Sequence, residues 1–540
     1  MKRAPLSLFL WLALCGLPGA LLAQDGPSRV ADVTPYIEAA QVLGVELDPG
    51  NDVVTYTQLA AGVDAQLAGR YSAGSASIRY ERRIGWGEDT LDGDTVSGIA
   101  RGSLALVPGA VTLEAGGLAA RTRVDGNGGT SLGGFGGDDS STSQIYSVYA
   151  GPSISTRSGD AQVEAHYRLG YTRVEAPDAV LTAPGAAPVD YFDDSTTHMA
   201  SARIGFAPGT VLPVIGVGIG GGWNEQDISN LDQRIRDRHV RGDVTVPLSP
   251  TVALLGGVGY EDVRISSRDA LRDGNGNAVI GSDGRYVTDP NAPRRIAYET
   301  DGLIWDAGVL WRPSRRTSLE AHVGRRYGST TYYGSFSYAP TRRSSINLSV
   351  YDNMTGFGGA LVDRISGLPT RFEAFRNPIS GAIGGCVASV EGDGCIGGAL
   401  GPIRSAVFRS RGVAGSYSID LGRTQMGLGA GYDRRRFIAA AGTVLAPANG
   451  VADENIWLAA YASTRLDRMS GITANANINW FDSGFDRAGR ATGYSASLAY
   501  YRDFIGGLSG TAAVGLDGIT REDVPDYMTA SALLGLRYSF

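Results

Sequence analysis

Two short patterns in this chain have the residue types and spacing of catalytic or cofactor-binding loops. Gly216, Gly218 and Gly221 fit G-x-G-x-x-G, but no helical pattern follows that could hold a pyrophosphate at its N-terminus. Residues 129–133 (GTSLG) fit the G-x-S-x-G nucleophile pattern, but they stand among Gly, Ser and Asp residues typical of a loop. We therefore interpret the glycines as part of a strand and residues 129–133 as a loop.

A third pattern resembles the start of a calcium-binding loop. Asp273, Asn275 and Asn277 have the spacing of the first ligands of an EF-hand. Ala278 stands where the sharp turn needs glycine, and Gly284 stands where a bidentate glutamate closes the site. We expect no metal site here.

The charged residues of two predicted strands suggest a different role. The chain has four histidines, and none has the H-x-x-x-H spacing of a metal-binding pair, so we expect no metal, no cofactor and no enzymatic activity. In both strands, polar residues of both signs occupy alternate positions. These candidate lumen-lining residues are Glu164, His166, Arg168, Glu320, His322 and Arg326. Such a face favours a passage for a hydrated, nearly neutral solute or polymer.

Composition restricts the elements that can position these residues. The chain has 77 glycines, 43% hydrophobic residues and 19% charged residues, which disfavours both a helical protein and a disordered one. The formal net charge is -7, and the sequence has no basic patch. We therefore expect no nucleic-acid partner.

Short alternating segments separated by turn residues recur along the chain, as in a series of hairpins. The clearest is 472–480, where Ile, Ala and Trp alternate with Thr and Asn, so that one face suits lipid and the other suits water. A β-sandwich also alternates, but one sandwich rarely exceeds about 250 residues. In hydrocarbon only a closed ring pairs every backbone group. The sequence thus predicts an all-β protein: a single closed antiparallel transmembrane β-barrel.

Counting the segments gives about 22 strands, within a range of 20–24. An even number places both termini on the periplasmic side, with short turns there and longer loops outside. The longest irregular stretch, residues 355–402, then lies outside the cell or folds into the lumen. Conductance across the barrel depends on which of these it does.

Residues 1–23 have the features of a cleaved signal peptide. Lys2 and Arg3 precede an apolar run, which is followed by small residues up to Ala23. The barrel would then comprise residues 24–540. Export leaves Cys386 and Cys395 as an even pair in an oxidising compartment, where we expect them to form a disulfide.

The last strand carries a second predicted signal. Its apolar side chains fall on every second position, with Leu533 as the one exception. The proposed assembly residues in this stripe are Leu534, Leu536, Tyr538 and Phe540. The pattern resembles the signal that directs bacterial outer-membrane barrels to their assembly machinery, and it predicts that the last strand seals the barrel against residues 36–43.

Four segments together resemble a known family: residues 33–38, 52–56, 80–83 and 324–328. They are similar to the outer-membrane β-barrel family associated with PEP-CTERM and exopolysaccharide systems of proteobacteria. The resemblance implies a channel or anchoring pore for export or surface retention of exopolysaccharide, with outer-membrane lipid, polysaccharide and polysaccharide-export proteins as partners. A general porin for small hydrophilic solutes is the alternative. A TonB-dependent receptor fits less well, because the sequence has no globular plug before the first strand.

Overall fold

The computed structural model describes residues 30–86, 93–124, 130–132, 142–175, 194–389, 391, 394–396, 400, 407–485, 489–522 and 525–540. The predicted signal peptide, residues 1–23, and the predicted start of the barrel at residue 24 lie outside these residues.

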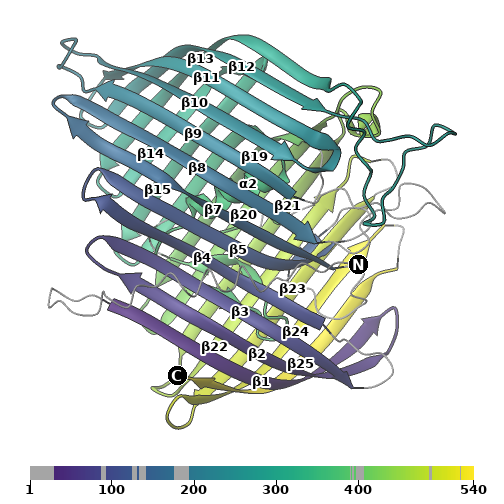
Figure 1. Cartoon of the computed structure of the whole chain (residues 1–540). Coiled ribbons are helices and arrows are strands. Elements are labelled where there is room, and N and C mark those ends of the chain that lie inside the picture. The colour runs from purple at the N-terminus through teal and green to yellow at the C-terminus, as the bar shows by residue number, and fades with distance from the viewer. Residues whose placement is uncertain are drawn as a thin grey trace.

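Twenty-two strands form one closed antiparallel ring, in which each strand pairs with its neighbours in the chain and β25 returns to β1 (Figure 1). The first half comprises β1 (Val30–Asp48), β2 (Val53–Ala68), β3 (Ser72–Trp86), β4 (Gly93–Val107), β5 (Val111–Val124), β7 (Thr142–Ser158), β8 (Ala161–Glu175), β9 (Asp194–Phe206), β10 (Gly216–Ile228), β11 (Gln233–Pro247) and β12 (Val252–Ser267). The second half comprises β13 (Arg295–Ser314), β14 (Thr317–Arg326), β15 (Ser329–Thr341), β16 (Ser344–Thr355), β19 (Val407–Asp420), β20 (Thr424–Ile438), β21 (Ala452–Arg465), β22 (Ser470–Asp482), β23 (Arg490–Asp503), β24 (Leu508–Arg521) and β25 (Tyr527–Ser539). A short strand, β6 (Thr130–Leu132), is attached to β5. The prediction of a closed 22-stranded β-barrel is confirmed.

The seam between the first and last strands closes the ring. Tyr36 is paired with Ser539, and the register continues to Leu43 opposite Ala532. The N–H of Phe540 donates a hydrogen bond to the carbonyl of Pro35 at 3.0 Å. The start of β1 and the end of β25 therefore lie at the same rim, which is the periplasmic rim in barrels with an even number of strands.

The exterior carries large apolar side chains at alternate strand positions. On β25, Leu534 is 71% exposed and Leu536 is 54% exposed, while the neighbouring Leu533 is 2% exposed and faces inward. Because every ring strand has a neighbour on both sides, the backbone polar groups of the wall are paired, as hydrocarbon requires. The chain is therefore an outer-membrane β-barrel.

Among the helices that the structure describes, none is long and apolar enough to cross a membrane.

The connections differ between the two rims. Most turns at the periplasmic rim are short, whereas residues 268–294 make a long connection at the extracellular rim. The connection from β14 to β15 departs from the expected pattern, because only Tyr327 and Gly328 make this extracellular turn, both with positive φ. The Tyr327 N–H donates to Glu261 Oε1 at 2.6 Å, and the buried Tyr327 ring lies within the interior apolar cluster. This turn therefore packs into the lumen through Tyr327 and does not form a long extracellular loop.

The described residues within 356–400, which we call the plug, fold into the lumen from the extracellular end between β16 and β19. The described part contains α2 (Phe357–Gly367) and a hairpin of β17 (Glu373–Arg376) and β18 (Ile383–Ala388). Elsewhere in the described chain, single-turn helices lie at Asn230–Asp232 and Ala446–Ala448. The plug occupies part of the stretch predicted to be irregular, so the prediction missed its helix and hairpin.

An apolar core fills part of the extracellular half of the lumen. One face of α2 packs against inward side chains near the extracellular ends of the wall strands. Members of this cluster include Ile99, Leu118, Ile145, Val174, Ile228, Ile235, Val263, Phe357, Leu361, Val362 and Ile365. Each such side chain contributes about 1.5–3 kcal/mol when it leaves water. The expected polar lumen does not extend to this core, because the plug supplies an apolar surface that the wall buries.

Candidate functional site: the barrel lumen

All six predicted lumen-lining residues lie on the interior face. On β8, Glu164, His166 and Arg168 share a face with Gly170, and a Cβ at Gly170 would lie 2.6 Å from a methyl carbon of Val362 in α2. On β14, Glu320, His322 and Arg326 likewise alternate with outward residues. Among the described residues no ion pair joins the two groups: Arg168 approaches Glu114, and Arg326 pairs with Asp237. His166, Arg168 and Arg326 nevertheless border one cavity.

A ladder of ion pairs connects β9 to β14 along the interior wall. Its members are Arg203, Asp243, Arg241, Asp306, His322 and Glu320. The Arg203 Nε donates to Asp243 at 3.0 Å, the Arg241 Nε donates to Asp306 at 2.6 Å, and the His322 ring lies between Asp306 and Glu320 at 2.9 and 3.0 Å. We call this set the charge ladder. Its charges compensate one another along the wall.

The side chains of the charge ladder extend along the wall. Arg203 and Asp243 are joined across β10, and Arg241 and Asp306 are joined across β12. The Arg241 guanidinium lies over Gly257 of β12 so closely that any Cβ at this position would collide with it. The bare backbone there allows the arginine to lie along the wall.

Sequence reasoning missed four members of the charge ladder, namely Arg203, Arg241, Asp243 and Asp306. A signal was present, because Asp237, His239, Arg241 and Asp243 occupy every second position of β11. The register places all of β11 beside β10 and β12, both rich in glycine. Alternating charges on a strand between glycine-rich strands would have predicted this part of the lumen wall.

A second ionic cluster lies on β1 to β3. Arg79 pairs with Glu38 at 2.8 Å and with Glu81 at 3.2 Å, and Arg83 pairs with Glu81 at 2.9 Å. Gln58 donates to the same Glu81 carboxylate. These groups are almost fully buried, since the hairpin of the plug lies over them.

Arg376, at the end of β17, fixes the plug to this side of the barrel. Its guanidinium donates to Ser77 Oγ at 3.1 Å, to Ser97 Oγ at 2.6 Å and to the Ser77 carbonyl at 2.7 Å. Its own carbonyl accepts a hydrogen bond from Asn475 of β22 at 3.2 Å. Within the described residues, Arg376 makes no ion pair, so the charge is held by neutral acceptors. The hairpin is thus held by β3, β4 and β22.

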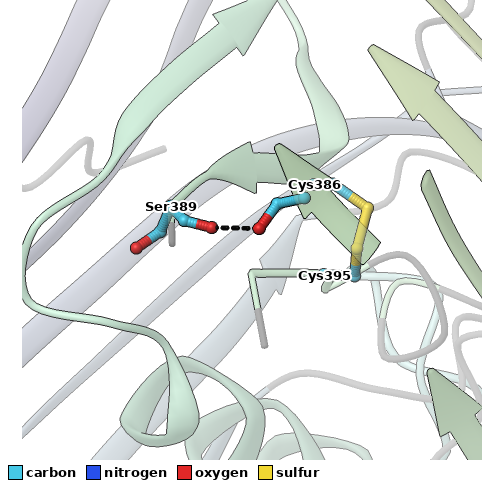
Figure 2. Close-up of a disulfide and its surroundings, with 4 residues drawn as sticks. Cys386, Ser389 and Cys395 are labelled. Atoms are coloured by element: carbon cyan, nitrogen blue, oxygen red, sulfur yellow. Dashed lines mark hydrogen bonds between the residues drawn. A yellow bond between two sulfur atoms is a disulfide. The ribbon is translucent and has the colours of Figure 1, made fainter. Parts of the chain in front are cut away.

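A disulfide fixes the other strand of the hairpin. Cys386 of β18 is bonded to Cys395, and Figure 2 shows the pair with Ser389, whose carbonyl accepts a hydrogen bond from Ser418 of β19 at 2.6 Å. Both sulfur atoms pack on the bare backbone of Gly429 in β20, where a Cβ would collide with Cys395 Sγ. The hairpin therefore spans the lumen from β3 and β4 to β20.

The three motif-like patterns lie in a strand, in a turn and in a segment that the structure describes only in part. Gly216, Gly218 and Gly221 lie in β10, which no helix of the described chain follows as a phosphate-binding helix would. The Asp273 carboxylate accepts hydrogen bonds from the N–H groups of Asn275 and Asn277 at 2.9 and 2.8 Å, so it stabilises its own loop. The backbone of residues 130–132 forms β6 and not the expected loop, while the side chains of residues 129–133 lie outside the described part. Among the described residues, no three His, Cys, Asp or Glu side chains are grouped as metal ligands.

The remaining histidines divide between the two faces. His239 faces inward beside Arg326, with 3.1 Å between their nitrogens. His198 faces outward, where it is hydrogen-bonded to Tyr167 at 2.8 Å and stacked on Trp223.

Comparison with known proteins gives only distant similarity. No protein-family model and no curated protein sequence matches the chain. Among solved structures, the FrpB iron transporter from Neisseria meningitidis is 10% identical with a TM-score of 0.43, and the alignment covers 94% of this chain and 81% of that one. The ferric-catecholate import receptor Fiu from E. coli K12, closed form, is 10% identical with a TM-score of 0.44 and the same coverage. The copper transporter OprC is 12% identical with a TM-score of 0.39, covering 96% and 82%. At these values the similarity supports no conclusion about cargo.

Proposed function

We propose that the protein is an outer-membrane channel that its own plug closes at rest, and that its cargo is an exopolysaccharide exported or retained at the surface. The observation that carries the channel is the charge ladder, which lines a lumen that the plug occupies only in part. A wall of mutually paired charges favours neither cations nor anions strongly, which suits a hydrated and nearly neutral polymer. The identity of the cargo as exopolysaccharide rests on the family resemblance of the sequence.

The plug makes a permanently open general porin the less favoured alternative. The wall side chains of a 22-stranded barrel leave a wide lumen between them. The part of the chain that folds into this lumen therefore determines which solutes pass. Here that part forms an apolar core supported by Arg376 and the disulfide. We assign no catalytic role to the chain, and we propose polysaccharide-export proteins and the barrel-assembly machinery as its partners.

The channel is testable by removing the plug. Thr355 and Phe408 are register partners, so a two-residue Asn-Gly turn in place of residues 356–407 connects β16 to β19 as a hairpin. In planar bilayers we expect a small conductance for the intact protein and that of a wide aqueous pore for the shortened one. Heat-modifiable gel migration of both proteins checks that the barrel folds. Equal conductance of the two folded proteins would contradict the role of the plug.

The cargo is testable with the same shortened barrel. Neutral oligosaccharides added to one side should interrupt the current in a concentration-dependent way, whereas acidic oligosaccharides of equal length should do so less. A barrel that conducts ions but responds to no oligosaccharide would support the general porin instead.

A further inference from the structure

A cavity of about 620 Å³ lies beside α2, and the proposed function assigns it no role. The apolar face of α2 packs against β5, β7, β8 and β9, whereas Ala360, Asp363 and Arg364 on its other face border the cavity. The opposite boundary comes from β11, β14, β16, β19 and β20. As Figure 1 shows, α2 lies within the ring, so the cavity is a chamber between plug and wall.

The charged groups that border this cavity are mostly paired. Arg326 pairs with Asp237 at 2.8 Å, and Arg435 pairs with Asp433 at 2.6 Å. The Asp433 carboxylate also accepts the hydroxyl of Tyr351 at 3.3 Å. An ionic ligand that competes for these four side chains would have to break a partly buried pair, which costs free energy unless the new partner is equally good. The chamber therefore favours a ligand without net charge.

Three further polar side chains face the chamber and can accept hydrogen bonds there, and an arginine lies beside them. The Asp363 side chain is exposed on α2, and Asn353 is exposed on β16. The buried Oδ1 of Asn224 on β10 has no hydrogen-bond donor among the described residues. The Arg364 guanidinium lies over the Tyr351 ring, 4.8 Å from its centroid, and presents a flat polar surface. Hydroxyl groups can donate to the first three side chains and accept from arginine.

We propose that this chamber is a binding site for a neutral, polyhydroxylated ligand, namely a short segment of saccharide chain. The cavity volume lies within the ~300–1,000 Å³ range of small-molecule sites. A ligand rich in hydroxyls satisfies Asn224, Asn353 and Asp363 without disturbing the ion pairs. The inference deepens the proposed function, on which the class of ligand rests, by locating where the plug contacts its cargo.

The test uses the full-length protein in detergent micelles. Calorimetric titrations with maltotriose, cellotriose and chitotriose as neutral probes, and with trigalacturonate as the acidic one, should show saturable binding of a neutral probe. Asp363→Asn and Asn224→Ala should each weaken that binding about tenfold or more. Glu391→Gln is the matched control, because Glu391 lies in the same plug but pairs with Arg371 away from the chamber. The control should bind as the parent does.

Two results would overturn the inference: binding of the acidic probe alone or of none, and equal affinity of the Asp363→Asn and Glu391→Gln variants. Neither result would by itself remove the proposed function, since current block by neutral oligosaccharides in the barrel without its plug is independent of this chamber. Conversely, the full-length protein could bind a saccharide in the chamber while the shortened barrel passes no current. That result would show a saccharide-binding barrel that is not a channel.

Discussion

Arg376 and the Cys386–Cys395 disulfide are two of the residue-level contacts that hold the plug against the wall. One holds β17 to β3 and β4 by charged hydrogen bonds to neutral acceptors, and the other rests on Gly429 of β20. The first contact is polar and directional, and the second depends on close packing. They can therefore be disturbed separately.

Removing the guanidinium should loosen the plug without unfolding the barrel. Hydrogen bonds to a charged group contribute about 1.5–3 kcal/mol each, and Arg376→Met also leaves the Ser77 and Ser97 acceptors unsatisfied. We expect faster cleavage of the plug by added protease and a higher channel-open fraction in bilayers. Arg371→Met is the control, because exposed Arg371 contacts only the plug residue Glu391 among its described ion pairs. Equal protease resistance of both variants would refute the anchoring role of Arg376.

Filling the space under the disulfide should displace it. Gly429→Val places a branched side chain where the two sulfur atoms lie, and overpacking of this kind typically costs about 1–3 kcal/mol. We expect the plug to become protease-sensitive while gel migration of the barrel stays that of the folded form. Ala430→Val adds similar bulk on the exposed exterior face of the same strand and should change neither property. An unaltered plug in Gly429→Val would mean that the disulfide can settle elsewhere.

At the scale of elements, the strands could be predicted from sequence and the plug could not. Alternation with period two fixes which face of each strand meets lipid, and the closed ring follows because hydrocarbon tolerates no unpaired edge. Leu533 shows the limit of the method. It breaks the alternation of β25, and the structure shows why: it packs with Ile379 of the plug and with Val42 and Tyr56 of the wall. An apolar residue on the lumen face of this strand therefore indicates packing against a segment that is distant in the sequence.

The helix α2 shows the same limit. Gly356 at its start offers no side-chain cap, although its N–H donates to Gln226 of β10 at 2.8 Å. Helix boundaries are predicted from capping residues and amphipathic spacing, and eleven residues are marginal as an isolated helix. The helix is stabilised instead by burying its apolar face against the wall, a contact between residues far apart in the sequence.

The assignment of strand faces is open to a paired test on β22. Ile478→Arg places a charge on the lipid face, at a cost of about 2–4 kcal/mol near the bilayer midplane, whereas Asn477 lies on the lumen face, where it donates to Ser495 at 2.7 Å. We expect Ile478→Arg to reduce the folded fraction on heat-modifiable gels much more than Asn477→Arg does. The reverse order would mean that the two faces are assigned wrongly.

At the scale of the whole molecule, the lumen is divided between two kinds of interior. In the extracellular half, wall and plug together form an apolar core beside buried ion pairs, and the charge ladder lines the wall beyond it. The sequence correctly predicted that the polar residues face the interior. It did not indicate that the wall also carries an apolar surface complementary to the plug. This division suggests that passage requires the plug to leave the wall as a unit, because separating one half-buried helix exposes its whole apolar face.

A covalent link between plug and wall tests whether this movement is needed. A Cβ built at Gly170 of β8 lies 3.3 Å from the Cβ of Val362 in α2, close to the separation of about 3.8 Å that a disulfide bridges. In the Gly170→Cys/Val362→Cys variant we expect an additional disulfide, detectable by mass spectrometry, and a conductance held at the closed level. Adding a reductant should restore opening of the variant. The parent protein, treated with the same reductant, is the control for reduction of the Cys386–Cys395 disulfide. If the linked protein opens as often as the parent, the plug need not leave β8, and the route for cargo must instead lie through the chamber on the other face of α2.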